Sequence, residues 1–238
     1  MAFRRSFVKG RPLKEICMDM YTDMMETMAL RHSVRQYDDR RIEQEKRDVL
    51  LCELARVNEE SGLHIQILFD EPKCFDSMMA HYGKFSGVQN YIALVGRKGE
   101  SLEELCGYYG ERLVLLAQSL GLNTCWVAMT HGRSAARIEE GEKQTCLIAL
   151  GYGLKQGVPH HSKAVSEVSK VEGSMPDWFE TGIEAALLAP TAMNQQKFVF
   201  ELKGDDVRAK VSGFGFYSKV DLGIVKYHFE VATGRHVG

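Results

Sequence analysis

The chain has 238 residues, of which 45% are hydrophobic and 26% are charged, which is ordinary for a soluble globular protein of one large domain or two small ones. Its 30 basic and 32 acidic residues give a formal net charge of -2, which argues against nucleic acid or a membrane surface as a partner. The N-terminus lacks the apolar core of a signal peptide, and no apolar run approaches ~18 residues, so we expect a cytoplasmic protein.

Three kinds of site are excluded by residue spacing. The six cysteines form no CxxC pair, and in a chain of this size they predict reduced, mostly buried thiols. The His160-His161 pair has no carboxylate or cysteine at ligand spacing, so no metal site is predicted. Gly151-Tyr152-Gly153 is too short and wrongly placed for the glycine-rich fingerprint of a Rossmann domain.

Apolar periodicity predicts the elements of the first half. Residues 1–19 are expected to be an N-terminal extension, and a helix that includes Tyr21 and Met28 ends before Arg31. Helices are then predicted at residues 43–57 and 102–120, and strands at 63–69, 91–96, 124–129 and 145–151. A short polar helix is expected between the last two strands.

The second half repeats part of this plan. After a polar connector at residues 159–176, a helix is predicted at 178–188, a strand at 197–202 and a helix at 221–233. Aligning the halves pairs Gly110 with Gly223 and Gly121 with Gly234. Glycines at helix ends also recur in unrelated sequences, so the sequence leaves open whether residues 20–150 and 151–238 are two fused halves that imitate a two-fold dimer.

One candidate binding segment is Arg31-His32-Ser33-Val34-Arg35. If it is extended, residues 31, 33 and 35 point the same way, and two guanidinium groups with a hydroxyl can hold a phosphate and set a cation against an electron-accepting ring. The alternative is a solvated basic turn. Lys163 is a further candidate phosphate ligand.

The second candidate is the stretch from Leu187 to Phe198. An apolar helix ends at Pro190 and opens into uncharged hydrogen-bonding side chains, among which Asn194 and Gln196 each carry a donor and an acceptor. Such side chains suit the edge of a planar ligand. The alternative is an ordinary helix-loop-strand connection.

Together these motifs resemble the FMN-dependent nitroreductases, and within them the single-chain pseudo-dimers. The resemblance spans about residues 20–234 and is carried, in order, by residues 31–35, 121–129, 147–153 and 189–196. It implies an α+β fold of three layers, with a central mixed, mainly antiparallel sheet flanked by helices. It also implies a monomeric pseudo-dimer or a weak homodimer.

One departure from the dimeric members is informative. Where their proline-to-asparagine loop follows the arginine motif closely, this chain has Ala55-Arg56-Val57-Asn58-Glu59-Glu60-Ser61-Gly62, and the recognisable loop lies in the second half. In the dimers this loop comes from the neighbouring subunit. The resemblance therefore implies that the second half acts as that neighbour, and that one FMN binds per chain instead of two.

By resemblance, Arg31 and Lys163 would bind the FMN phosphate, Ser33 would add a hydroxyl, and Arg35 would lie where reduction places negative charge on the ring. Asn194 would pair with the polar ring edge. The predicted cofactor-binding set is completed by His32, by Ala128 and Met129 near the hydride-accepting ring nitrogen, and by Pro190, Thr191, Ala192 and Gln196.

The implied reaction transfers hydride from NADH or NADPH through FMN to a nitroaromatic, quinone or flavin-type acceptor, and no side chain serves as a nucleophile. Two alternatives remain open at this stage. One is a flavin-binding or flavin-processing protein of the same fold without NAD(P)H turnover. The other is an α+β protein that binds no flavin.

Overall fold

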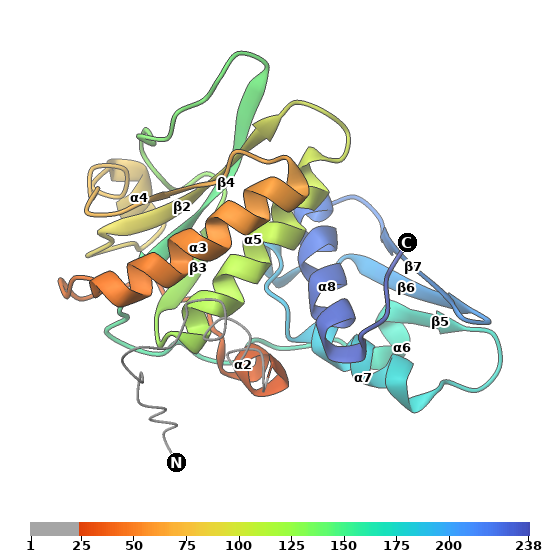
Figure 1. Cartoon of the computed structure of the whole chain (residues 1–238). Helices are drawn as coiled ribbons and strands as arrows, with labels where there is room; N and C mark the ends of the chain where they lie inside the picture. The colour runs from red at the N-terminus through yellow and green to blue at the C-terminus, as the bar shows by residue number, and fades with distance from the viewer. Residues whose placement is uncertain (1–23) are drawn as a thin grey trace.

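The computed structural model describes residues 24–238, and Figure 1 shows their arrangement. The helices are α2 (Met24–Leu30), α3 (Gln44–Ser61), α4 (Met78–Tyr82), α5 (Leu102–Ser119), α6 (Val165–Val168), α7 (Asp177–Leu187), the short 3-10 helix η1 (Ala192–Asn194) and α8 (Ser218–Thr233). The strands are β1 (Gln66–Leu68), β2 (Asn90–Arg97), β3 (Asn123–Val127), β4 (Glu142–Gly151), β5 (Ser169–Val171), β6 (Phe198–Lys203) and β7 (Asp206–Val211).

The larger sheet is antiparallel throughout and has the strand order β1-β2-β4-β3. Its two central strands are apolar and buried from Tyr91 to Val95 in β2 and from Cys146 to Leu150 in β4, because both faces of the sheet are covered there. Ile92 and Ile148 point into the cluster that also holds residues of α3 and α5, whereas Tyr91 and Leu147 point into a second cluster that includes Phe75. The sheet is therefore the middle of three layers.

The smaller sheet has the order β5-β6-β7, with β5 parallel and β7 antiparallel to β6. It packs against α7 and α8 through aromatic rings, of which Phe200 and Phe229 stack with centroids 4.9 Å apart. The prediction of an α+β fold with mixed, mainly antiparallel strands is confirmed. The strands are divided between two sheets because the second half contributes its own hairpin, β6-β7.

Helices α5 and α8 run side by side through the middle of the molecule and join the two halves (Figure 1). They cross closely at two glycines. A Cβ atom on Gly107 would lie 2.0 Å from the carbonyl oxygen of Val220, and one on Gly223 would lie 2.0 Å from that of Glu104. The contact is reciprocal, as across a two-fold axis. In it Gly223 corresponds to Gly107, whereas the alignment of the two halves of the sequence pairs Gly223 with Gly110.

Three connecting segments differ from the sequence-based expectation. No helix separates β3 from β4, because residues 128–141 form an irregular loop. The polar connector contains α6 and the short strand β5, and a further strand, β7, follows β6. The start of the first predicted helix, around Tyr21, lies outside the described residues.

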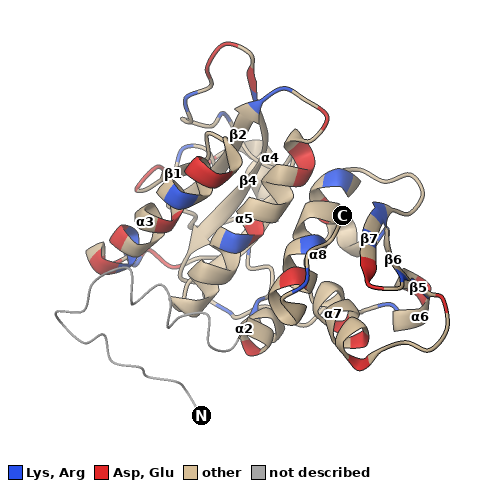
Figure 2. Ribbon diagram, turned by 45° about the vertical axis from the view of Figure 1, so that its right-hand side comes forward, with Lys and Arg blue, Asp and Glu red and all other residues tan. Residues whose placement is uncertain are grey.

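Acidic and basic side chains are interspersed on the helices and loops (Figure 2). Within residues 24–238, no helix is long and apolar enough to cross a membrane. As predicted for reduced thiols, the described cysteines are free; Cys52 is half-buried, whereas Cys74, Cys106, Cys125 and Cys146 are buried.

Candidate functional site

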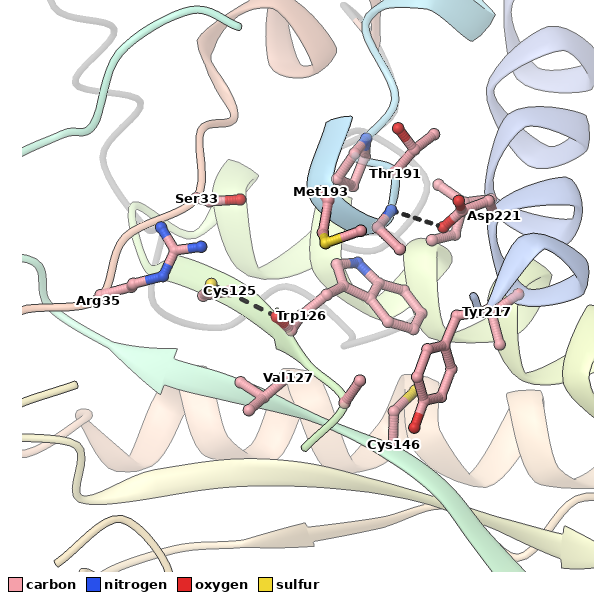
Figure 3. A pocket seen from close by; sticks show the side chains of 15 residues that line it. Ser33, Arg35, Cys125, Trp126, Val127, Cys146, Thr191, Met193, Tyr217 and Asp221 are labelled. Carbon is pink, nitrogen blue, oxygen red and sulfur yellow. Dashed lines mark hydrogen bonds between the residues drawn. The ribbon is translucent and has the colours of Figure 1, made fainter. Parts of the chain in front are cut away.

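A pocket lies where the two halves meet, and three of the segments singled out in the sequence line it (Figure 3). Its walls come from the segment after α2, the end of β3, the loop around η1, and the start of α8. The lining residues are Ser33, Arg35, Cys125, Trp126, Val127, Ala128, Cys146, Pro190, Thr191, Ala192, Met193, Tyr217, Val220, Asp221 and Ile224.

Ser33 and Arg35 reach the pocket because residues 33–37 are held as an extended segment against the sheet. Ser33 forms a parallel bridge with Thr124, and the Val34 amide donates to the Thr124 carbonyl at 3.0 Å. Alternate side chains then point in opposite directions, so Val34 is buried while Ser33 and Arg35 face the pocket. Arg35 has no carboxylate partner among the described residues and lies 5.9 Å from the centroid of the Phe85 ring.

Arg31 does not line the pocket. The predicted alternation fails at this residue because its amide still donates to the Thr27 carbonyl at the end of α2, so the extended segment begins only afterwards. Its side chain is 3% exposed and lies 3.9 Å from the Glu111 carboxylate, and its Nε has no hydrogen-bond partner among the described residues. Burial lowers the pKa of Arg31, and Glu111 partly opposes this shift.

Glu111 is the centre of a buried polar network behind the pocket. Its Oε2 accepts from Nε1 of the pocket-lining Trp126 at 2.9 Å, and its Oε1 lies 3.0 Å from Nε2 of His228. Nδ1 of His228 lies 2.9 Å from the Ala185 carbonyl, which can only accept, so Nδ1 carries a proton. The network ties α5, α7 and α8 to the floor of the pocket.

The loop after Pro190 has an unusual backbone. Met193, Asn194 and Gln196 have φ values of 50°, 53° and 45°, a left-handed conformation that residues other than glycine adopt at a cost. Pro190, Thr191 and Ala192 line the pocket as predicted in the sequence, and so does Met193.

The predicted ligands Asn194, Gln196 and Lys163 form a cluster of their own beside the pocket. Nε2 of Gln196 donates to Asn194 Oδ1 and to the His161 carbonyl, both at 2.8 Å. The Lys163 amide donates to Gln196 Oε1 at 2.8 Å, and Lys163 Nζ donates to the Gln196 carbonyl at 2.8 Å. These side chains shape the loop and are not among those that line the pocket.

His32 does not line the pocket, and the charged groups that act on it are Arg31 and His160. The pKa of its imidazole is lowered by burial first, and then by the nearby Arg31 and His160. Arg31, His32 and His160 thus lie close enough together for their charges to interact.

The end of β3 supplies the remaining wall. Ala128 lines the pocket, whereas the side chain of Met129 is 70% exposed and lies outside it. Cys125 and Cys146 also line the pocket, and burial raises the pKa of both thiols, which keeps them protonated near neutral pH.

Among the lining residues that escaped the sequence analysis are two polar ones, Tyr217 and Asp221. Tyr217 precedes α8 with a φ of 57°, and Asp221 lies in the first turn of α8 with 3% exposure. An acidic residue inside the otherwise apolar run from Val220 to Val225 was the signal available for Asp221. It was read only as the start of a helix, where acidic side chains are common.

Comparison with known proteins assigns the family. Residues 23–233 match the family model described as "Putative TM nitroreductase". The chain belongs to this family. No curated protein sequence matches the chain. Among solved structures, the TM nitroreductase fold recurs in "a putative nitroreductase" from Thermotoga maritima, with a TM-score of 0.60, 20% identity, and coverage of 89% of this chain and 84% of that one.

Two further structures share the fold over a smaller part of the chain. A nitroreductase-like protein from Streptococcus mutans has a TM-score of 0.53 and 14% identity, covering 65% of this chain and 100% of its own. A Desulfovibrio desulfuricans protein with the same description as the Thermotoga one, solved in complex with FMN, has a TM-score of 0.51 and 15% identity, covering 64% of this chain and 98% of its own. At these identities the likeness concerns the fold.

Proposed function

We propose that this chain is an FMN-dependent NAD(P)H oxidoreductase, a nitroreductase in the broad sense, with its flavin at the pocket between the two halves. The observation that carries the proposal is the meeting of three distant segments on this pocket. They are residues 33–35 after α2, residues 125–128 at the end of β3, and residues 190–193 around η1. The FMN complex of the Desulfovibrio desulfuricans protein, which shares the fold, supports the choice of cofactor.

The residues present suit FMN. Arg35 offers a cation without a carboxylate partner among the described residues, and the orphaned Nε of Arg31 is a buried donor close to the pocket-lining Cys125. An anionic ligand would satisfy such groups. With Lys163 and His32 nearby, Arg31 would hold the phosphate if its side chain turned away from Glu111. Pro190, Thr191 and Ala192 would wall the ring, and Asn194 and Gln196 would fix the loop that carries them.

When bound, FMN supplies the redox chemistry by accepting hydride from NADH or NADPH and delivering it to the acceptor. The protein's part is binding and electrostatics. Arg35 would stabilise the negative charge that builds on the ring, and the backbone after Val127 would supply hydrogen-bond donors at its reactive edge. Met193 lines the pocket with an exposed side chain, and Phe214 and Phe216 are exposed in the segment just before the lining residue Tyr217. Such apolar groups suit a flat aromatic acceptor such as a nitroaromatic or a quinone.

The structure also supports one flavin site per chain. The first-half segment Ala55–Ser61, which replaces the family loop, lies inside α3 and ends at Gly62. Asn58 is fully engaged there: its Nδ2 donates to the Ile65 carbonyl and its Oδ1 accepts from the Ile65 amide, both at 2.9 Å. A helix whose asparagine holds β1 cannot present a loop like residues 190–196.

Absorbance spectroscopy of the purified protein tests the proposal. We expect a yellow protein, or one that takes up added FMN, with a flavin-to-chain ratio near one, whose flavin bands bleach anaerobically on addition of NADH or NADPH. Flavin that binds but is not bleached would instead indicate a flavin-binding protein without turnover. A colourless protein that rejects added FMN would refute both, and a ratio near two would refute the single site.

Substitution of two predicted ligands tests the placement of the cofactor. Arg31→Ala and Asn194→Ala are each expected to weaken FMN binding by about 1–3 kcal/mol, since one removes a charged donor and the other removes a bond that shapes the loop. The measurement is the dissociation constant from quenching of flavin fluorescence. Arg208→Ala is the matched control, because Arg208 lies on the exposed β6-β7 hairpin and, among residues 24–238, forms an ion pair with Asp206 alone. If both variants bind FMN like the wild type, the site is misplaced.

A further inference from the structure

The loop that faces the pocket cannot hold its shape alone. Three of its residues, Met193, Asn194 and Gln196, have positive φ, and none of them is glycine. Each such residue costs free energy and persists only where its surroundings impose it. The hydrogen bonds between Gln196, Asn194 and Lys163 fix the C-terminal part of the loop. The N-terminal part, which lines the pocket, needs a separate restraint.

Asp221 of α8 supplies this restraint. Its Oδ1 accepts from the Ala192 amide at 2.9 Å, and its Oδ2 accepts from Nε2 of Gln195 at 2.7 Å. Thr191, the residue before η1, makes no side-chain cap of its own, so the Asp221 carboxylate caps this turn from another element. Gln195 Nε2 also donates to the Phe216 carbonyl at 2.8 Å, which joins the loop to the segment before α8. Figure 3 shows Asp221 at the pocket wall beside Thr191.

Burial of the Asp221 carboxylate is unfavourable, because it removes the charged group from water. Asp221 is 3% exposed and has no ion-pair partner among the described residues. Burial raises its pKa to about 6, and the bonds from Gln195 and Ala192 only partly offset this shift. A residue serving the fold alone would be better satisfied as a neutral side chain.

The other titratable groups that line the pocket do not change their protonation state near neutral pH. Arg35, from the segment after α2, is a permanent cation. Cys125 of β3 and Cys146 of β4 are thiols of raised pKa, and burial also raises the pKa of Tyr217, so these three stay neutral. Glu103 of α5 and Lys143 of β4, which act on Tyr217, are partly exposed and pair with each other at 3.1 Å. Asp221 is thus the lining group that titrates in this range.

We propose that Asp221 is a positioning residue, which holds residues 191–196 in the shape that binds the flavin. The proposal rests on the proposed function, since it takes FMN as the ligand. The ionised carboxylate accepts two hydrogen bonds. A protonated carboxyl, or an asparagine, has one donor where the carboxylate has two acceptors, so this donor faces either the Ala192 amide or Gln195 Nε2, both of which also donate. Turning the Gln195 amide to accept it would break the bond to the Phe216 carbonyl.

The test compares FMN binding by the wild type, Asp221→Asn and Gln195→Leu, measured by flavin fluorescence between pH 5 and pH 8. Asp205→Asn is the matched control, because it makes the same chemical change at a side chain that is 98% exposed. At pH 8 we expect Asp221→Asn and Gln195→Leu to raise the dissociation constant about tenfold or more, the effect of losing a charged hydrogen bond. The control should bind FMN like the wild type.

The pH profile separates positioning from a purely structural role. The phosphate of free FMN titrates near pH 6 and does so alike in the experiments on the wild type and on the variant, so the informative quantity is the ratio of the Asp221→Asn dissociation constant to that of the wild type. This ratio should fall several-fold from pH 8 to pH 5, as the wild-type carboxylate itself becomes protonated. A ratio near one at pH 8, or a ratio that does not change with pH, would overturn the proposal while leaving the flavin function intact. If the wild type fails to bind FMN, both fall together.

Discussion

Glu111→Ala should lower the free energy of unfolding by about 3–5 kcal/mol, the usual cost of removing one member of a buried charged network. Glu111 and His228 are each 0% exposed, and the substitution would leave Trp126 Nε1 without its acceptor, His228 Nε2 without its partner and Arg31 without its nearby carboxylate. Urea unfolding followed by circular dichroism measures the loss. We also expect weaker FMN binding, because Trp126 is part of the pocket.

The same pair of helices offers a matched control. Glu104 of α5 pairs with Lys226 of α8 at 2.7 Å, but its side chain is 36% exposed. Glu104→Ala should therefore cost less than about 1 kcal/mol, as exposed ion pairs do. Equal losses for the two variants would show that the buried network contributes no more than the exposed pair. Glu111→Gln should fall between them, since it keeps an oxygen for Trp126 but removes the charge.

The buried network also helps to fix the position of the two halves relative to each other. Glu111 lies on α5 in the first half, whereas His228 and Ala185 belong to the second. A polar core between halves fixes their relative position more strictly than an apolar one, because each hydrogen bond has one satisfied geometry. The position of the halves in turn sets the distance between Arg35 and the loop around η1. The pocket therefore depends on residues that do not touch it.

Much of the fold could be predicted because its strands and helices carry clear periodicity. Helix α5 was predicted to within one residue, and β2 reads as a continuous apolar run because both its faces are covered. The missed strand β7 also has a signal, since Val207 and Ala209 alternate with exposed polar residues. The loop at residues 128–141 could not be predicted: its shape depends on distant contacts, such as the Ala135 amide with the Tyr91 hydroxyl at 2.9 Å.

Which side chains face the pocket could be predicted where the backbone is regular, but not where it is irregular. The alternation of an extended segment places Ser33 and Arg35 correctly, but it fails at Arg31, which still belongs to the end of α2. Asn194 and Gln196 looked like ligands because each has a donor and an acceptor. In the folded chain these groups bond to each other, to the His161 carbonyl and to the Lys163 amide. Sequence spacing does not report which partner a polar side chain finds.

Adding a single methyl group is expected to lower the free energy of unfolding most at the crossing of α5 and α8. Glycine-to-alanine changes inside a helix ordinarily raise stability by up to about 1 kcal/mol, since glycine is the more flexible residue. Gly107→Ala and Gly223→Ala should each lower it instead, by about 3 kcal/mol, because the new methyl group would meet a backbone carbonyl that cannot move without separating the helices. Gly99→Ala is the control, since no atom lies within 4 Å of its would-be Cβ and its φ is ordinary.

The two glycine variants also test the fused-dimer interpretation of the chain. Gly107 faces the Val220 oxygen and the Ile224 nitrogen, and Gly223 faces the Glu104 oxygen and the Tyr108 nitrogen, so each glycine meets the residues three before and one after the other. This reciprocity is what an isologous interface requires. If the crossing retains it, the single variants should cost similar amounts, and the double variant should cost clearly less than their sum, because one separation of the helices accommodates both methyl groups. The contrary results would be additive losses of the free energy of unfolding, or one single variant as stable as the wild type. Either would mean that each side of the crossing adjusts to its methyl group independently, and that the likeness between the halves does not extend to their packing.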